Sequence, residues 1–530
     1  MEKDKFISVF LHEGQRYTQA QLIQMLQASE AEGVRILKRL KEYGILKAVK
    51  GQDDSVDLTE LTEEHVELAE VKAGDSSRYY VSYFVGVIMV EGRVLKCYPK
   101  YLPDNAEPVD ELKQVLKVLN KFNRKEQIIY MQNETDYESS FNLLAVMLYL
   151  LQDYYDYGLY TNTQEIIESN GNGEILWDKT INETFTLISN NRPYYPELLT
   201  RKRVTNDYDY FRRLHACVLT ECSELLKESD LADLFGIDTV ELSTEQREDF
   251  GDDEYIMHRI MMELNVQYNT HKQLLLKTLY AYIAHGGVQS QNEGFSMYGT
   301  NSFHVVWEKV CAEVLGNQLD VPMKNLDVPI PYDSSSTLKQ FIEKPEWVGL
   351  NDDGTVFSVN AQETLEPDII GIEWHNSMCY FMIYDAKYYS MKFEPGLLNK
   401  QPGIESVTKQ YLYQQAYREF INAVGIIETR NCFLLPTCED KIMNKGVVRL
   451  GMLEQFGLQP IEVRLLPAKD VYRDYLQGQK YKVENLELFD NTSSATTMRK
   501  ITHGNKVTKM YPGGTSIYGE AATQVKKYNL

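Results

Sequence analysis

Cysteine is scarce in this sequence and follows no pattern. Seven cysteines occur among 530 residues, and no two of them form a Cys-x-x-Cys pair. A zinc ribbon needs such pairs and a disulfide framework needs an even number of cysteines, so the sequence favours neither. Scattered thiols are instead typical of a protein in a reducing cytoplasm.

Long hydrophobic runs are also missing. The most apolar short stretch, residues 83–90, is far too brief to cross a bilayer, and residues 1–50 lack the basic start and apolar run of a secretory signal. We therefore expect a soluble, cytoplasmic protein with no membrane partner. The chain is too long for one compact core, so we expect three or four domains.

Two catalytic signatures are absent. The sequence contains no G-x-x-x-x-G-K-[ST] loop, so we expect that this chain binds no nucleotide itself. It contains no G-x-S-x-G sequence either, which argues against a serine hydrolase of that type.

Positive charge is scarce, since 55 lysines and arginines face 77 acidic residues and the net charge is −22. Nucleic-acid binding depends on local potential rather than on total charge. The acidic residues are concentrated in residues 52–75 and 221–254, whereas residues 1–50 and 469–530 carry more basic than acidic side chains. The composition permits DNA binding through the two ends, and equally a basic protein partner on the acidic segments.

The first fifty residues predict a winged helix. Thr18 can cap one helix, and Ser29 can cap a second with Glu32 at the capping-box position. A strand follows the second helix, which is the element order of a helix-turn-helix with a wing. Because winged helices bind either DNA or proteins, both contacts stay open. The candidate DNA contacts are the cations on the second helix: Arg35, Lys38 and Arg39.

Changes in pattern along the chain predict a multidomain α+β protein. Residues 1–75 form the winged-helix domain with an acidic linker, residues 76–111 a small β-rich segment, and residues 112–298 a mainly helical middle domain. Residues 299–470 form an α/β domain, and residues 471–530 a basic, partly flexible extension. The basic cluster 201–203 fits a solvated loop or a phosphate contact.

Residues 367–387 predict a β-hairpin that gathers two carboxylates and a lysine. Asp368 opens one strand, turn residues follow at 375–377, and Asp385 and Lys387 end the second strand. Side chains alternate between the faces of a strand, so Asp385 and Lys387 share a face, and the hairpin returns them to Asp368. A surface hairpin with solvated charges is the alternative, because this residue pattern alone is common.

These side chains suit metal-assisted cleavage of a phosphodiester. Mg²⁺ prefers oxygen ligands, so Asp368, Asp385 and the backbone carbonyl of Ala386 are candidate ligands, and Mn²⁺ is expected to substitute for it. The metal would polarise the phosphoryl group and acidify a water, and the Lys387 ammonium would hold that water or the phosphate.

Two flanking helices add candidates. Glu308 lies in the middle of an amphipathic helix over residues 303–311 and is a candidate third acidic ligand, or a solvated helix residue. Gln410 and Gln414 lie one turn apart on a later helix. Gln410 is a candidate active-site residue that contacts the DNA backbone, with ordinary packing of this helix as the alternative.

The Pro-Asp…Asp-Ala-Lys hairpin resembles the PD-(D/E)xK nuclease superfamily, and the wider chain resembles the McrC-like LlaJI family of restriction endonuclease subunits. The segments that carry the resemblance are residues 85–101, 173–181, 303–311 and 367–387. The resemblance implies a PD-(D/E)xK nuclease domain whose catalytic residues are Asp368, Asp385 and Lys387, with Glu308 beside them. The sequence departs from the related Q-x-x-x-Y motif, because Gln410 is followed at that spacing by Gln414.

The resemblance further implies a type II-like or McrBC-like restriction endodeoxyribonuclease of a bacterial antiviral system. It would cut double-stranded DNA with Mg²⁺, in a hetero-oligomeric complex with an McrB-like AAA+ GTPase. The missing nucleotide-binding loop fits this division of labour. Two alternatives are a non-catalytic adaptor that binds DNA or stimulates the GTPase through a degenerate nuclease fold, and an RNA or DNA-repair nuclease.

Overall fold

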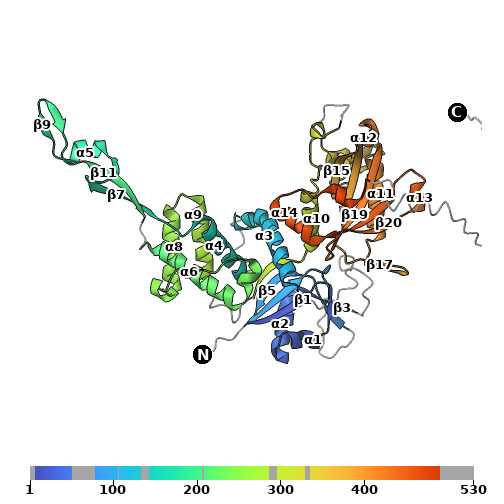
Figure 1. Ribbon diagram of the computed structural model, residues 1–530, viewed down its shortest axis with the longest axis horizontal. Coiled ribbons are helices and arrows are strands. Elements are labelled where there is room, and N and C mark those ends of the chain that lie inside the picture. Colours follow the sequence, from blue (N-terminus) through green and yellow to red (C-terminus); the bar gives the residue numbers. More distant parts are fainter. Residues whose placement is uncertain are drawn as a thin grey trace, which may run out of the picture.

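The computed structural model describes residues 6–50, 78–104, 107–132, 142–205, 208–285, 295–328 and 335–489. Most of the predicted acidic linker and the end of the chain from residue 490 lie outside these ranges. The fold is mixed α/β and multidomain, as Figure 1 shows. Among the described residues, no helix is both long and apolar enough to cross a membrane.

The chain begins with short elements whose caps were predicted correctly. They are β1 (Ile7–His12), β2 (Arg16–Tyr17), α1 (Gln19–Met25), α2 (Glu30–Glu42), β3 (Leu46–Lys50) and β4 (Arg78–Ser82). Thr18 and Ser29 each close a capping box, the second with Glu32. Strands β2, β4 and β3 form an antiparallel sheet beside the helices. The winged-helix interpretation of this order stays a prediction.

A second sheet joins the start of the chain to the β-rich segment. Its order is β1-β6-β5-β12, with β5 (Val85–Val90), β6 (Arg93–Tyr98) and β12 (Phe295–Thr300), and β1 runs parallel to β6. The hydrophobic run 79–90, within the predicted β-rich segment, divides between two sheets. Residues 6–50 and 78–98 also share one hydrophobic core. Strand patterns show which segments are extended but not which segments pair. The sequence therefore did not predict that residues 6–50 and 78–98 share a sheet and a core.

Outside residues 163–205, the chain between β6 and β12 is mainly helical, as predicted. They are α3 (Val109–Gln132), α4 (Leu143–Tyr157), α6 (Tyr210–Glu228), α7 (Leu231–Phe235), α8 (Asp253–Val266) and α9 (Thr270–Ala284). Ile256 and Ile260, one turn apart, are both fully buried. Since β12 pairs with β5, this helical body is an insertion between neighbouring strands of one sheet.

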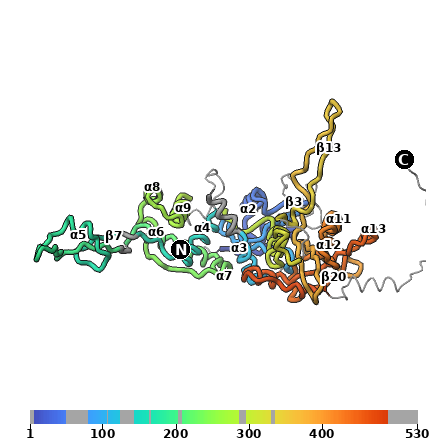
Figure 2. Tube along the Cα trace, turned by 90° about the horizontal axis from the view of Figure 1, so that it is seen from above, coloured from blue at the N-terminus to red at the C-terminus, as the bar shows by residue number. Residues whose placement is uncertain are grey.

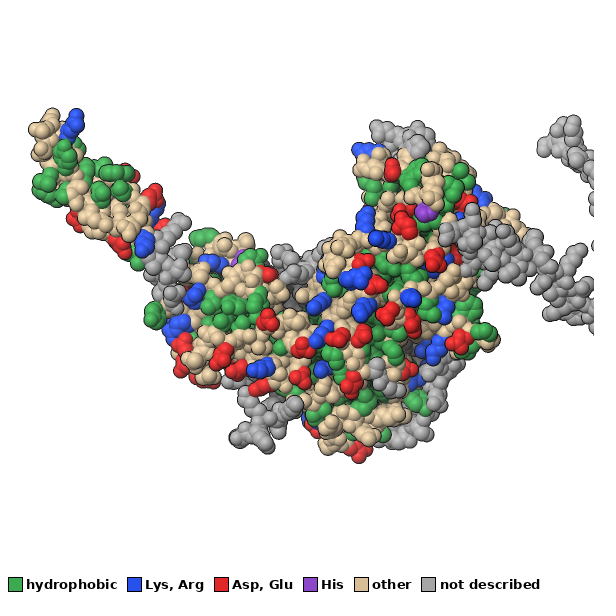
Figure 3. Space-filling view, in the orientation of Figure 1, with side chains coloured by type: hydrophobic (Ala, Val, Ile, Leu, Met, Phe, Trp, Pro, Cys, Tyr) green, Lys and Arg blue, Asp and Glu red, His purple; other side chains and the backbone are tan. Residues whose placement is uncertain are grey.

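An arm of short strands extends from the helical body (Figures 1 and 2). It contains β7 (Thr163–Ser169), β8 (Glu174–Ile175), α5 (Trp177–Glu183), β9 (Leu187–Ser189), β10 (Arg192–Tyr194) and β11 (Leu199–Thr205). Much of its surface is hydrophobic (Figure 3), including the exposed side chains of Trp177, Phe185, Ile188 and Tyr194. The mainly helical prediction was wrong for this stretch. Arg201 lies in β11, not in a loop, and contacts Glu174.

The last part of the chain forms a five-stranded sheet in the order β15-β16-β19-β21-β20. The strands are β15 (Ile369–His375), β16 (Met378–Ala386), β19 (Glu428–Thr437), β20 (Met443–Val448) and β21 (Ile461–Pro467). Strands β16, β19 and β21 run parallel. The helices of this part are α10 (Phe303–Val314), α11 (Ile404–Ala416), α12 (Arg418–Ala423), α13 (Gly451–Glu454) and α14 (Ala468–Gln477).

Two small hairpins leave this sheet. One consists of β13 (Glu346–Leu350) and β14 (Val356–Asn360) and extends well beyond the body in Figure 2. The other consists of β17 (Lys392–Glu394) and β18 (Leu397–Asn399), which follow β16 closely in the chain.

The stretch 471–489, predicted as part of a basic extension, belongs to the fold instead. Helix α14 packs on α3 and α10. Its residues Val471, Tyr472 and Tyr475 are buried, as is Leu486 beyond the helix. The excess of lysine and arginine over residues 469–530 concealed this apolar face, which has helical spacing.

Candidate active site

The predicted hairpin is present, and its register brings the two aspartates together. Strands β15 and β16 pair antiparallel with Ile369 opposite Tyr384, which places Asp368 beside Asp385. The turn residues Asn376 and Ser377 both have positive φ angles, of 48° and 63°. Both carboxylates therefore lie at the end of the sheet where the parallel strand β16 terminates.

Lys387 completes the cluster. Its Nζ lies 3.0 Å from Oδ1 of Asp385, and the two side chains are only 21% and 7% exposed. Burial alone would lower the pKa of Lys387, but the charges of Asp385 and Asp368 outweigh it and raise that pKa above its usual value. The ammonium group thus stays charged at every pH at which the protein would work.

Asp368 is the member of the pair whose carboxyl has a raised pKa. Burial raises the pKa of its carboxyl well above the usual range, and the charge of Asp385 raises it further. Backbone contacts hold the residue in place: the N–H of Ala386 donates to Oδ2 of Asp368 at 3.1 Å, and Asn317 Nδ2 donates to its carbonyl at 3.0 Å. A bound cation would reduce the electrostatic repulsion between two carboxylates fixed in this way.

Helix α10 adds two titratable side chains on one face. Burial raises the pKa of Glu308, with Lys387 acting against this and Asp385 with it. Burial lowers the pKa of His304, one turn earlier, and the charges of Lys100 and Lys387 lower it further. The helix is fixed by Trp307, whose Nε1 donates to the carbonyl of Leu434 in β19 at 3.1 Å.

Helix α11 carries the two glutamines singled out from the sequence and also Tyr413. Gln414 binds the backbone of Gln459 through both ends of its amide at 2.8 Å, which is a structural role. Gln410 is completely buried, and its amide makes no hydrogen bond within the described residues. Its role in the active site stays a prediction, and burial argues against a contact with DNA. Tyr413 donates from its hydroxyl to the carbonyl of Glu366 at 2.8 Å.

The donors present fit a hard divalent cation in part. Asp368 and Asp385 offer two carboxylates whose charges oppose each other, which is the arrangement that a cation stabilises. No three carboxylate, imidazole or thiol groups of the described residues come close enough to surround a metal ion. The ligand roles of Glu308 and of the Ala386 carbonyl therefore stay predictions.

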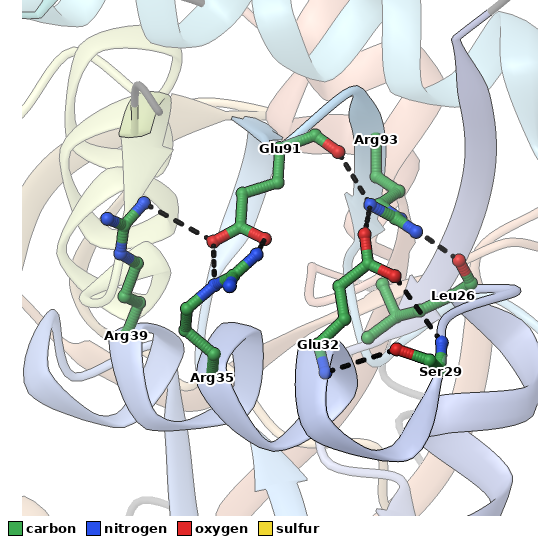
Figure 4. Close-up of polar contacts among 7 residues, drawn as sticks. All are labelled: Leu26, Ser29, Glu32, Arg35, Arg39, Glu91 and Arg93. Carbon is green, nitrogen blue, oxygen red and sulfur yellow. Dashed lines mark hydrogen bonds and ion pairs between the residues drawn. The ribbon is translucent and has the colours of Figure 1, made fainter. Parts of the chain in front are cut away.

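The candidate DNA contacts on α2 lie away from the Asp368–Asp385 pair, and two of them form ion pairs within the protein (Figure 4). Arg35 donates to both carboxylate oxygens of Glu91, at 2.9 and 2.6 Å, and Arg39 lies 3.5 Å from the same group. Glu91 lies in the turn between β5 and β6, so these arginines anchor the helix to the sheet. Lys38 is exposed, and no ion pair with a described residue involves it.

Sequence reasoning missed His304 and Tyr413. His304 lies four residues before Glu308, so helical spacing from that candidate was the available signal. Tyr413 lies three residues after Gln410, one short of the expected Q-x-x-x-Y spacing, and a search tolerant of that offset would have found it.

Comparisons with known proteins point to one group. The profile of a family described as LlaJI restriction endonuclease matches residues 84–454. The type II restriction enzyme BsuMI component YdjA of Bacillus subtilis (strain 168) is 26% identical over 429 residues, which cover 78% of this chain and 85% of that protein.

Two solved structures from Thermococcus gammatolerans also match, each at 13% identity. One is a half-complex from the tetradecameric assembly of McrB AAA+ hexamers with bound McrC; the match covers 89% of this chain and 99% of the other, with a TM-score of 0.34. The other is the McrBC complex, where the match covers 57% and 85%, with a TM-score of 0.23. Scores of this size do not establish a shared fold.

Proposed function

The chain belongs to the LlaJI restriction endonuclease family, and we propose that it is the DNA-cleaving subunit of a restriction system. The observation that carries the proposal is the meeting of Asp368, Asp385 and Lys387 at one end of the β15–β16 hairpin. A surface hairpin with solvated charges would not bury these groups or shift their pKa values so strongly.

Each residue has a role that follows from its position. Asp368 and Asp385 would hold Mg²⁺, and Glu308 would serve as a third acidic ligand. Such an ion polarises a phosphoryl group and lowers the pKa of a water. Lys387, kept charged by its neighbours, would hold the phosphate oxygen on which charge grows during hydrolysis. The carboxylates must be ionised for this, so activity should rise with pH as Asp368 loses its proton.

We further propose that the chain acts with an McrB-like AAA+ GTPase in a hetero-oligomeric complex. The support is the resemblance to McrC-like subunits, which covers most of the chain from about residue 80 to 470, together with the absence of a nucleotide-binding loop from the sequence. In this arrangement the partner hydrolyses GTP, and this chain supplies the groups that cut double-stranded DNA.

Plasmid cleavage tests the proposal. The chain would be combined with an McrB-like GTPase, Mg²⁺ and GTP, and linear product would be measured over time. Wild type should cut, and Asp385→Asn should lose activity by about 100-fold or more, because it removes a ligand and the partner of Lys387. Glu373→Gln is the matched control, since Glu373 is a half-buried carboxyl on β15 away from the pair.

Equal cleavage by wild type and Asp385→Asn would rule out this site. Absence of cleavage by wild type, combined with stimulation of GTP hydrolysis in the partner, would instead support the non-catalytic adaptor.

A further inference from the structure

A cavity of about 630 Å³ lies between the amino-terminal elements and the five-stranded sheet. Its walls come from the end of β1 and the turn after it, from the segment after β6, from the chain that follows β16, and from the end of β19 with the chain that follows it. This volume is in the range of ligand-binding sites. Nothing in the proposed cleavage chemistry uses it.

The cavity starts next to the candidate active site. After Lys387 the chain continues through Tyr388 and Tyr389 into residues 390–392, which line the cavity. On the neighbouring strand, Leu434 accepts a hydrogen bond from the N–H of Lys387 at 2.9 Å, and residues 436–439 line the cavity. Ligands of sheets with parallel strands bind beyond the carboxyl ends of the strands, which is where this cavity lies.

Lys100 joins the two regions. Its Nζ lies 4.7 Å from the ring centre of Tyr388 and 5.6 Å from that of Tyr389, and Lys100 also lines the cavity. Burial lowers the pKa of His304, and the charges of Lys100 and Lys387 lower it further, so both cations lie near one imidazole. Positive charge therefore extends from the catalytic lysine into the cavity.

Cations outnumber anions along the cavity wall, in a chain whose net charge is −22. The four cationic side chains are Arg16, Lys100, Lys392 and Lys400. Of the acidic side chains, Glu13 accepts from the Tyr388 hydroxyl at 2.5 Å and from the Lys100 N–H at 3.1 Å, and Asp104 lies 2.7 Å from His12. Glu439 is the third. Two of the three carboxylates thus already have partners inside the protein.

We propose that this cavity binds the sugar–phosphate backbone of the DNA strand that leads to the active site, with Lys392 and Lys400 contacting its phosphates. The proposal rests on the proposed function, since it assigns the path of that same substrate. Lys392 opens β17 and Lys400 follows β18, so both stand at the base of one hairpin on the cavity rim. Because phosphate contacts carry no sequence information, this surface should bind all sequences alike.

DNA binding by charge-reversed variants tests the proposal. Lys392→Glu with Lys400→Glu would be made in the Asp385→Asn background, so that the DNA stays intact. Fluorescence anisotropy with a labelled duplex, measured at several salt concentrations, gives the dissociation constant and its salt dependence. The pair should weaken binding about tenfold or more, and lower the slope of log K against log salt by about 1 for each lost phosphate contact.

The matched control is Lys179→Glu with Lys227→Glu, which makes the same change in net charge on two exposed lysines of the arm and of α6. Equal affinity and slope in the two double variants would overturn the proposal, as would an intact chain that binds no DNA. The outcome is independent of the cleavage test: failure of wild type to cut DNA would reject the nuclease function, whatever the binding measurements show.

Discussion

At the scale of residues, the candidate site consists of two carboxylates that repel each other and a lysine that one of them holds. Alternation along β16 and the return of the hairpin were sufficient to predict that Asp368, Asp385 and Lys387 meet. The sequence could not predict how deeply they are buried, because burial depends on how α10 and α11, which lie outside the hairpin, pack on β16. That burial makes Asp368 unusual.

The raised pKa of Asp368 predicts a stability cost that grows with pH. The pKa is raised to about 9 in the folded protein, so the favourable contribution of this carboxyl is complete below its usual pKa of 3.8 and is lost as pH rises toward 9. In metal-free protein, Asp368→Asn should therefore be more stable than wild type by about 0.5–2 kcal/mol at pH 8, and nearly equal to it at pH 4.

Thermal unfolding in the presence of a chelator, at both pH values, measures this difference. Added Mg²⁺ should then raise the melting temperature of wild type but not that of the variant. Asp352→Asn, at an exposed hairpin tip, is the control and should change neither. A gain of the same size at pH 4 and pH 8 would show that charge on Asp368 is not the cause.

The hydroxyl of Tyr413 should matter to the metal and not only to stability. It holds the carbonyl of Glu366, two residues before Asp368, and burial followed by the charges of Asp385 and Asp368 raises its pKa. Tyr413→Phe should cost about 1 kcal/mol of stability and weaken Mn²⁺ binding about tenfold, because it frees the segment that positions Asp368.

Tyr417→Phe supplies the comparison. Its hydroxyl donates to the carbonyl of Leu338 at 2.9 Å in an equally buried setting, so a similar loss of stability is expected with unchanged metal affinity. Calorimetric titration with Mn²⁺ distinguishes the two variants without any cleavage assay. Identical metal affinities would make Tyr413 purely structural.

At the scale of elements, the sequence predicts features formed by neighbouring residues, such as helix caps. It does not predict contacts between side chains that are far apart in the chain. Capping boxes predicted where α1 and α2 begin, because a cap is formed by residues three positions apart. Contact of Arg35 and Arg39 with DNA stays a prediction, and the structure adds that both bind Glu91, which lies more than fifty positions away in sequence. Nothing in the spacing of charges along a helix shows such a partner.

Glu91 should accordingly contribute to the stability of the amino-terminal part. Its side chain is 6% exposed and contacts two arginines, one of which is 61% exposed. Glu91→Gln should destabilise the protein by about 0.5–1 kcal/mol, the modest value expected when one partner is solvated. Chemical denaturation measures the change, with Glu42→Gln on the exposed face of the same helix as the control.

A double-mutant cycle between Glu91→Gln and Arg35→Gln isolates the interaction. A coupling energy of zero would mean that the contact in Figure 4 contributes nothing to folding.

At the scale of the whole molecule, one continuous core runs from the amino-terminal sheet through the helical body to the five-stranded sheet. The arm over residues 163–205 takes little part in it, since its strands pair only with each other. The domain boundaries drawn from the sequence show neither the continuous core nor the separate arm. Hydrophobic residues of the arm are exposed, so they follow neither the helical nor the strand period that marks a buried face.

Changes in the arm should therefore leave the body intact. Phe185→Ser with Ile188→Ser removes two side chains that are 71% and 77% exposed, and should shift the melting temperature by less than about 1 °C. Ile256→Ala and Ile260→Ala, at fully buried positions of α8, are the contrast and should each cost about 2–5 kcal/mol. A large loss of stability from the arm variant would indicate that the arm is packed against another part of the chain.

The insertion of the helical body between β6 and β12 also affects how the protein is made. On the ribosome, β5 emerges with six residues that are buried in the fold, and its partner β12 follows roughly 200 residues later. At about 5–20 residues per second, that edge waits some 10–40 s before it can pair. An unpaired apolar edge invites association with other nascent chains. Helix formation is far faster than synthesis, so slow translation of the inserted segment is what would lengthen this exposure. The yield of folded protein should therefore depend on codons and temperature there.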